Sequence, residues 1–162
     1  MSNTKIFQVS FLKYLRFYRI FMINKQNTTN QTFQTQFRVN KELSKEECKF
    51  ILQKDNINSS QLEQLIEARE KNNIKFNLID VREWIEWVGY RIKYSNYLIP
   101  TTSFYEALKQ IENEKEIPSV VYCHIGQRSA YCQNVMRELG FKTVTNLTDG
   151  IAGYHGDIVR GK

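Results

Sequence analysis

The chain has 162 residues, enough for one domain of ordinary size with an appendage but too few for two full globular domains. Apolar residues make up 41% and charged residues 25%, which is typical of a soluble globular chain and excludes a collagen-like one. The net charge is +6, but residues 1–40 hold six of the 23 basic side chains and no acidic one. The other 17 basic side chains match the 17 acidic ones, so residues 41–162 are neutral and nucleic acid is not expected as a partner.

Residues 1–43 are predicted to form an N-terminal extension, basic and aromatic at first and then rich in Asn, Gln and Thr. Within it, residues 6–23 are strongly apolar but interrupted by three basic residues, which argues against a transmembrane helix or a secretory signal. Residues 24–40 are typical of a linker or disordered tract. A disordered or loosely docked extension is the favoured interpretation. The alternatives are a helix lying on an anionic membrane surface and a true start at Met22.

Two capping boxes predict the first helices of the folded region. Ser44–Glu47 opens a short helix over residues 44–54, and Ser60–Glu63 opens an amphipathic helix that runs to about Asn72. A short buried strand over 76–79 follows.

The same alternation continues to the end of the chain. An apolar stripe predicts a helix over 104–111, and a short strand follows at 120–122. A third helix carries an apolar stripe over 132–139 and is closed by Gly140, before a strand at 143–147. Helices that alternate with short buried strands predict an α/β fold, in which a parallel sheet is covered by helices on both faces.

The segment after the strand at 120–122 is the strongest candidate for chemistry. Cys123 directly follows this strand, four residues intervene, and Arg128 and Ser129 then begin a helix. A loop of this kind, with Gly126 and no acidic residue, can turn its amide N–H groups inward beside a helix N-terminus and bind an anion. The same field, with the charge of Arg128, should lower the pKa of Cys123 and favour the thiolate, which is the nucleophile toward sulfur.

Other residues near this loop have structural interpretations. Cys123 itself could be a small buried hydrophobe, although its context favours a functional role. Asp80 and Arg82 end the neighbouring predicted strand and are expected to form a structural ion pair in preference to touching substrate. Trp84 and Trp87 are expected to pack over the sheet in preference to lining the rim of the site.

The remaining cysteines do not indicate a scaffold or a metal site. Cys48, Cys123 and Cys132 are scattered, there is no CxxC motif, and only two histidines are present. We therefore expect no disulfide framework, no metal and no cofactor. Cys132 lies on an apolar helical stripe and is expected in the core. Thiols without a scaffold role suit a reducing compartment, so a cytoplasmic location is predicted.

Several short motifs, in order and spacing, resemble the rhodanese-like domain family over about residues 55–160. DVRE alone is a weak motif, but its combination with CxxGxRS about forty residues later is specific. The matching pieces are Leu78-Ile-Asp-Val-Arg-Glu83, Leu98-Ile-Pro100, Val120-Val-Tyr-Cys-His-Ile-Gly-Gln-Arg-Ser129, Leu139-Gly-Phe141 and Asn146-Leu-Thr-Asp-Gly-Ile151.

This resemblance implies a rhodanese-like domain over 55–162, with a five-stranded parallel sheet, and a single-domain sulfurtransferase. Cys123 would take sulfane sulfur from thiosulfate or another persulfide donor and pass it, through a cysteine persulfide, to a thiol or cyanide-like acceptor or to a sulfur-carrier protein. Asp80 and Arg82 would support the site. The residues implied to hold the persulfide and the donor anion are His124, Ile125, Gly126, Gln127, Arg128 and Ser129.

Two other functions remain open for such a fold. A cysteine phosphatase is disfavoured, because phosphatases of the same fold have five residues between Cys and Arg, enough to cradle a phosphate, whereas Cys123 and Arg128 are separated by four. A non-catalytic regulatory or docking module is the main alternative, although the presence of Cys123 argues for catalysis.

Overall fold

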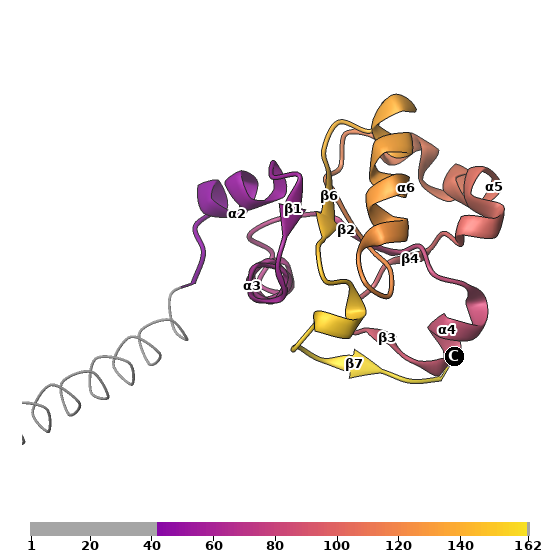
Figure 1. Cartoon of the computed structure of the whole chain (residues 1–162). Coiled ribbons are helices and arrows are strands. Elements are labelled where there is room, and N and C mark those ends of the chain that lie inside the picture. The colour runs from indigo at the N-terminus through magenta and orange to yellow at the C-terminus, as the bar shows by residue number, and fades with distance from the viewer. Residues whose placement is uncertain (1–41, 162) are drawn as a thin grey trace, which may run out of the picture. The chain divides into compact units, whose positions relative to one another are not determined.

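A computed structural model describes residues 42–161 (Figure 1). The expectations for an extension, a membrane-surface helix or a later start concern residues 1–41, which lie outside this range. None of the helices in residues 42–161 is long and apolar enough to cross a membrane. The elements in chain order are α2 (Lys45–Leu52), β1 (Asn56–Ile57), α3 (Ser59–Glu70), β2 (Asn77–Asp80), α4 (Trp84–Gly89), β3 (Arg91–Ile92), β4 (Tyr97–Leu98), η1 (Thr101–Ser103), α5 (Phe104–Leu108), η2 (Lys109–Glu114), β5 (Ser119–Tyr122), α6 (Gln127–Glu138), β6 (Val144–Leu147), η3 (Ile151–Gly153) and β7 (Ile158–Val159).

The central sheet is five-stranded and parallel, with the strand order β1-β6-β5-β2-β4. The predicted α/β fold class is therefore confirmed. β5 lies at the centre of the sheet, between β6 and β2, and Asp80 of β2 is in register with Tyr122 of β5. The carboxyl ends of β2 and β5 consequently meet at one edge, which is where ligands bind in open parallel sheets.

Alternate residues of the buried strands divide the core into two clusters, one on each face of the sheet. Leu78 and Val120 belong to the cluster under α2 and α3, whereas Ile79 and Val121 belong to the cluster under α5 and α6. Figure 1 shows these two helical layers on opposite sides of the strands. Side chains alternate between faces along a strand, so a run of consecutive apolar residues covers both faces at once.

The short helix α2 packs into the first of these clusters. Its Ser44 cap forms the predicted capping box with Glu47. Cys48, Ile51 and Leu52 are all buried, so this helix shares one hydrophobic core with the strands that follow it.

The start of α3 differs from the sequence prediction. The N-cap is Asn58, whose side chain accepts from the Gln61 amide while the Gln61 side chain accepts from the Asn58 amide; Ser60 is not the cap. The Ser59 hydroxyl donates to Glu63 one turn further along α3 and accepts from the amide of His155, which is distant in sequence. The chain turns into the helix immediately after β1 pairs with β6, which moves the start earlier than the local pattern indicates.

The helix predicted over 104–111 is interrupted. α5 ends at Leu108 and the chain continues as 3₁₀ turns, because Ile111 leaves helical geometry with φ −122° and ψ 19°. Ile111 is nevertheless fully buried against β2 and β5 in the second cluster. Burial of this side chain outweighs the continuity of local helical hydrogen bonds.

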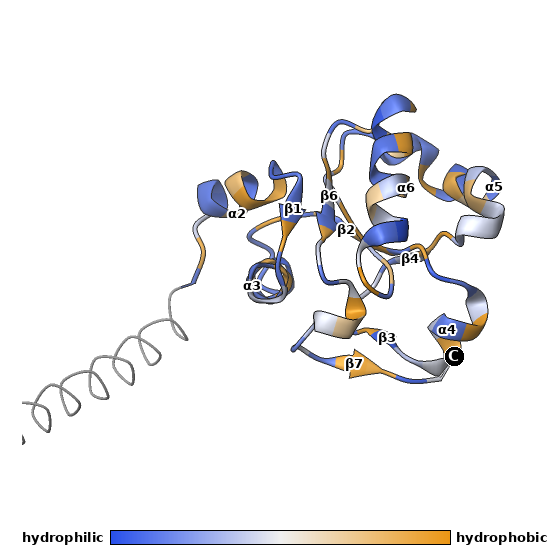
Figure 2. Ribbon diagram, in the orientation of Figure 1, coloured by the Kyte–Doolittle hydropathy of each residue, from blue (hydrophilic) through white to orange (hydrophobic). Residues whose placement is uncertain are grey.

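A second, two-stranded sheet pairs β3 with β7 in antiparallel fashion. It places the C-terminal segment beside α4, where the amide of Gly161 donates to Val88 (Figure 1). β7 is among the most apolar elements in Figure 2, although Ile158 remains 46% exposed. This sheet was not predicted from the sequence, because two-residue strands carry almost no periodic signal.

Candidate active site

The cysteine loop lies where β5 ends and α6 begins, at the carboxyl edge of the sheet. Gly126 caps α6 and has φ +85°, a left-handed conformation that favours glycine. A Cβ atom at this position would lie 1.8 Å from the carbonyl oxygen of Thr148. Backbone bonds from Ile151 to Cys123 and from Ala152 to His124 brace the loop from the η3 side. The loop is therefore tightly curved and fixed by the segment after β6.

The Cys123 side chain lies inside this curve and is 1% exposed. Burial by itself would raise its pKa, but hydrogen bonds from Ser129 and from the amides of Ser129, Ile125 and Gly126 outweigh burial and lower the pKa below the ordinary thiol value. The Ser129 hydroxyl is shared, because it also lies 3.1 Å from the carbonyl oxygen of Gly126. Of the loop amides expected to face inward, those of Ile125, Gly126 and Ser129 therefore point to the sulfur. An anion on sulfur is stabilised here mainly by neutral donors at a helix N-terminus.

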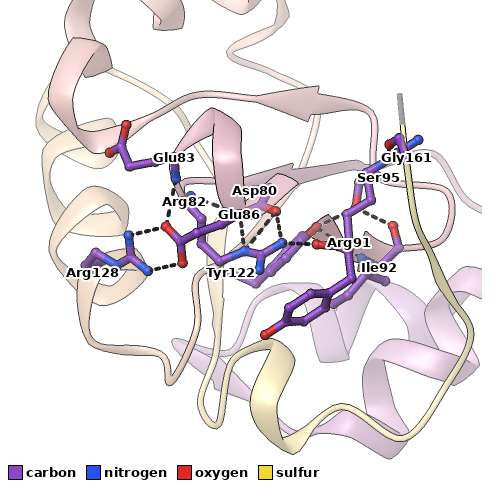
Figure 3. A network of polar contacts seen from close by, with 11 residues as sticks. Asp80, Arg82, Glu83, Glu86, Arg91, Ile92, Ser95, Tyr122, Arg128 and Gly161 are labelled. Atoms are coloured by element: carbon purple, nitrogen blue, oxygen red, sulfur yellow. Dashed lines mark hydrogen bonds and ion pairs between the residues drawn. The ribbon is translucent and has the colours of Figure 1, made fainter. Parts of the chain in front are cut away.

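Arg128 contacts the Cys123 side chain, and its charge is compensated by another residue (Figure 3). Its two terminal nitrogens donate to the two carboxylate oxygens of Glu86, at 2.9 and 2.8 Å. The pairing raises the pKa of Arg128, and the hydrogen bonds from Arg128 lower the pKa of Glu86 to about 2. The sequence predicted a cationic contact from Arg128. The structure adds that this guanidinium is oriented and neutralised by a carboxylate 42 residues earlier.

Glu86 was missed because its link to the loop is purely tertiary. It lies on α4, where its Oε2 also accepts from the Glu83 amide and so closes a capping box at the helix start. Glu83 in turn accepts from the hydroxyls of Thr101 and Thr102, at 2.9 and 2.7 Å. The spacing of Glu83 and Glu86 after a strand was the available signal. It indicates a helix start at the same sheet edge as Cys123.

Asp80 and Arg82 form the expected ion pair behind the site. Both side chains are fully buried, and the Arg82 Nη2 lies 2.7 Å from Asp80 Oδ2. The same nitrogen donates to the backbone carbonyl of Tyr90, and the guanidinium carbon lies 5.0 Å from the Tyr90 ring. The same guanidinium carbon lies 5.8 Å from the centre of the Tyr122 ring, and the Tyr122 hydroxyl bonds to that of Ser95 at 2.8 Å (Figure 3). A pair with no exposed surface supports the strand ends and cannot touch a substrate directly.

The remaining loop residues form the rim. His124, Ile125 and Gln127 are exposed, and Ile125 is 52% exposed although its amide points inward. Trp84 is 56% exposed, so it does not pack over the sheet as expected. It occupies the first residue of α4, whose six residues include none that is buried.

Cys132 lies in the core, as the apolar stripe predicted. It is 1% exposed and belongs to the same cluster as Cys123. Burial, followed by the charge of Cys123, raises the pKa of Cys132 to about 12. Cys48 is also buried, and burial raises its pKa as well. Of the three thiols, only Cys123 has a lowered pKa.

These features define an α/β domain that holds a cysteine thiol in an anion-binding loop. The family model of the rhodanese-like domain matches residues 61–157. The chain therefore belongs to the rhodanese-like domain family. No curated protein matches the sequence.

Solved structures of rhodanese-like proteins share this fold. A rhodanese-like domain from Anabaena is 19% identical with a TM-score of 0.57, over 66% of this chain and 80% of that one. A rhodanese-related protein from Thermoplasma volcanium is 26% identical with a TM-score of 0.52, over 65% and 98% of the two chains. A thiosulfate sulfurtransferase from Pseudomonas aeruginosa is 18% identical with a TM-score of 0.57; the match covers 67% of this chain and 20% of that protein.

Proposed function

We propose that the protein is a sulfurtransferase that carries sulfane sulfur as a persulfide on Cys123. The observation that carries this proposal is the set of donors around one thiol: the Ser129 hydroxyl and the amides of Ile125, Gly126 and Ser129. These donors favour the thiolate that must attack, and afterwards the same sulfur as a leaving group.

In the first half-reaction, the Cys123 thiolate attacks the outer sulfur of thiosulfate. A bond forms between the two sulfurs, the sulfur–sulfur bond of thiosulfate breaks, and its electron pair leaves on sulfite. Cys123 becomes Cys123–S–S⁻, and charge is conserved. In the second half-reaction, a thiol or cyanide attacks the outer sulfur, and the electron pair of the broken bond returns to Cys123 as the thiolate.

Arg128 has a positioning role for the donor anion in this scheme. Because Glu86 compensates its charge, the dianionic donor is bound mainly by loop amides and the helix N-terminus, and Arg128 contributes directed hydrogen bonds more than net charge. Asp80 and Arg82 hold the strand ends on which the loop depends.

The proposal extends to partners and location. A sulfur-carrier protein is a further acceptor class, since the exposed rim of the loop can meet a macromolecule. A cytoplasmic location fits the three free thiols among the described residues, because a reducing compartment keeps such thiols unpaired. A membrane contact by the basic and aromatic residues before Lys41 remains part of the hypothesis.

The test is intact-mass measurement after incubation with thiosulfate and removal of excess donor. We expect the gain of one sulfur atom, about 32 Da, and release of one equivalent of sulfite. Cys123→Ser should abolish the adduct. Cys48→Ser, which alters a buried thiol with a raised pKa in the other core cluster, is the matched control and should keep it. No adduct, or an adduct that survives Cys123→Ser, would overturn the assignment.

A further inference from the structure

A pocket of about 430 Å³ lies between α6 and the segment formed by η1 and α5, and its α6 wall is one helical turn beyond Arg128. Its lining combines three hydroxyl side chains from η1 with aromatic side chains from α5 and α6. Tyr105 and Tyr131 flank it and are 65% and 68% exposed. The lining residues are Thr101, Thr102, Ser103, Phe104, Tyr105, Glu106, Tyr131 and Cys132.

Two sets of contacts join this pocket to the catalytic loop. The hydroxyls of Thr101 and Thr102 donate hydrogen bonds to the carboxylate of Glu83. The backbone amide of Glu83 in turn donates to Glu86, which pairs with Arg128. On the opposite wall, Tyr131 and Cys132 follow Arg128 by three and four residues on α6, so they lie one turn further along the same helical face. Cys132 also packs in the same core cluster as Cys123.

The charges around the pocket disfavour an anionic ligand. Among the described residues that line it, Glu106 is the one charged side chain, and it pairs with Lys109 at 2.6 Å. The nearest cation of the loop, Arg128, is already paired with Glu86. A ligand carboxylate placed in this pocket would lose its hydration without gaining an ion pair, because no unpaired cation is found among the described residues of the lining. Hydroxyl and aromatic groups of a ligand can instead bond to the hydroxyl side chains and pack against the aromatic rings of the lining.

We infer that this pocket is the acceptor site, and that the acceptor is an uncharged organic thiol with a ring or hydroxyl groups. The inference rests on the proposed function, since it names the acceptor for the persulfide of Cys123. The acceptor thiol attacks the outer sulfur of Cys123–S–S⁻, a new sulfur–sulfur bond forms on the acceptor, and the bond to Cys123 breaks. The electron pair stays on Cys123 as thiolate, and the thiol proton leaves with the acceptor persulfide.

The experiment separates loading from unloading. The protein is loaded with thiosulfate, freed of donor, and mixed with para-(mercaptomethyl)benzyl alcohol or para-(mercaptomethyl)benzoate, which share one benzylic thiol and differ in charge. Loss of the added sulfur is followed by mass and normalised to the loaded fraction. We expect saturation with the alcohol and a rate constant at low concentration about tenfold above that of the carboxylate.

Two variants locate the effect. Tyr131→Ala should raise the half-saturating concentration of the alcohol about tenfold by removing an aromatic wall. Glu106→Lys, which puts a cation in the lining, should shift preference toward the carboxylate. Phe50→Ala is the matched control, because Phe50 is 66% exposed but lies on α2, and it should change neither value.

The outcomes distinguish the two proposals. Loading followed by equal, unsaturable reaction of both thiols in all variants would overturn the acceptor pocket and leave sulfur transfer intact. If loading itself fails, sulfur transfer falls, and NMR titration of the resting protein with benzene-para-dimethanol decides the pocket. Shifts centred on Thr102 and Tyr131 would support this binding site, and their absence would overturn it.

Discussion

Glu86 holds the guanidinium of Arg128 through two parallel hydrogen bonds of 2.9 and 2.8 Å, and so fixes an arginine that contacts the Cys123 thiol. The pair joins α4 to the first turn of α6. Orientation of the arginine is thus determined outside the loop in which the arginine lies.

The Glu86–Arg128 pair should give the protein a specific acid sensitivity. The pKa of Glu86 is lowered from 4.5 to about 2, so its contribution is complete above about pH 4.5 and is lost as the pH falls toward 2. We expect Glu86→Gln, which keeps the acceptor for Glu83, to lower the free energy of unfolding at pH 7 by about 1–2 kcal/mol after solvent screening. Urea denaturation at several pH values should show the two proteins converging near pH 2. Glu67→Gln, at an exposed pair with Lys71, should cost under about 0.5 kcal/mol. A constant difference at every pH would contradict this account.

The Ser129 hydroxyl should account for part of the reactivity of Cys123. Its hydrogen bond lowers the pKa of the thiol, so Ser129→Ala should raise that pKa and slow alkylation by iodoacetamide at neutral pH about tenfold. The pH profile of alkylation measures the change. Ser95→Ala removes a hydroxyl that bonds to Tyr122 instead and should leave the profile unaltered. An unchanged profile in Ser129→Ala would show that the amides alone stabilise the thiolate.

Gly126 should not tolerate a side chain. Gly126→Ala combines a positive φ with a Cβ only 1.8 Å from Thr148, so the loop must distort. We expect loss of persulfide formation and a decrease of about 2 kcal/mol or more in the free energy of unfolding. Gly89→Ala is the control, because nothing lies within 4 Å of its added Cβ. Normal sulfur loading by Gly126→Ala would show that the loop can relax.

The buried pair of Asp80 and Arg82 should contribute to stability far more than a surface pair. Asp80→Ala leaves a fully buried guanidinium without its carboxylate, and we expect a loss of about 3–5 kcal/mol in urea denaturation. Asp55→Ala removes the partner of Arg137 at a site where Asp55 is 76% exposed, and should cost less than about 1 kcal/mol. Equal effects of the two substitutions would contradict a structural role for the buried pair.

The helix α2 should be an integral part of the domain, although it precedes the residues 61–157 matched by the family. Leu52 is 1% exposed in the first core cluster, so Leu52→Ala should cost about 2–5 kcal/mol. Phe50→Ala, on the exposed face of the same helix, should cost less than about 1 kcal/mol. If chemical denaturation found no difference between them, α2 would not be part of the cooperative unit.

Local sequence pattern predicted most of the fold and singled out the thiol whose pKa the structure lowers. The consecutive apolar residues of β2 and β5 can only be buried on both faces, which requires a sheet between two helical layers. Cys123 and Gly126 are neighbours in sequence, so the loop and its inward amides follow from a strand, a turn and a helix start taken together. The short strands β3 and β7 could not be found in this way.

Only the tertiary structure decided what surrounds the loop. The compensation of Arg128 depends on α4 reaching the same sheet edge as α6. The cap of α3 lies at Asn58 because the chain turns into the helix directly after β1 pairs with β6. The break at Ile111 arises from burial against strands distant in sequence. Hydrogen bonds within one turn are encoded by residues a few positions apart, whereas the pairing of a charge depends on which distant elements the packed core brings together.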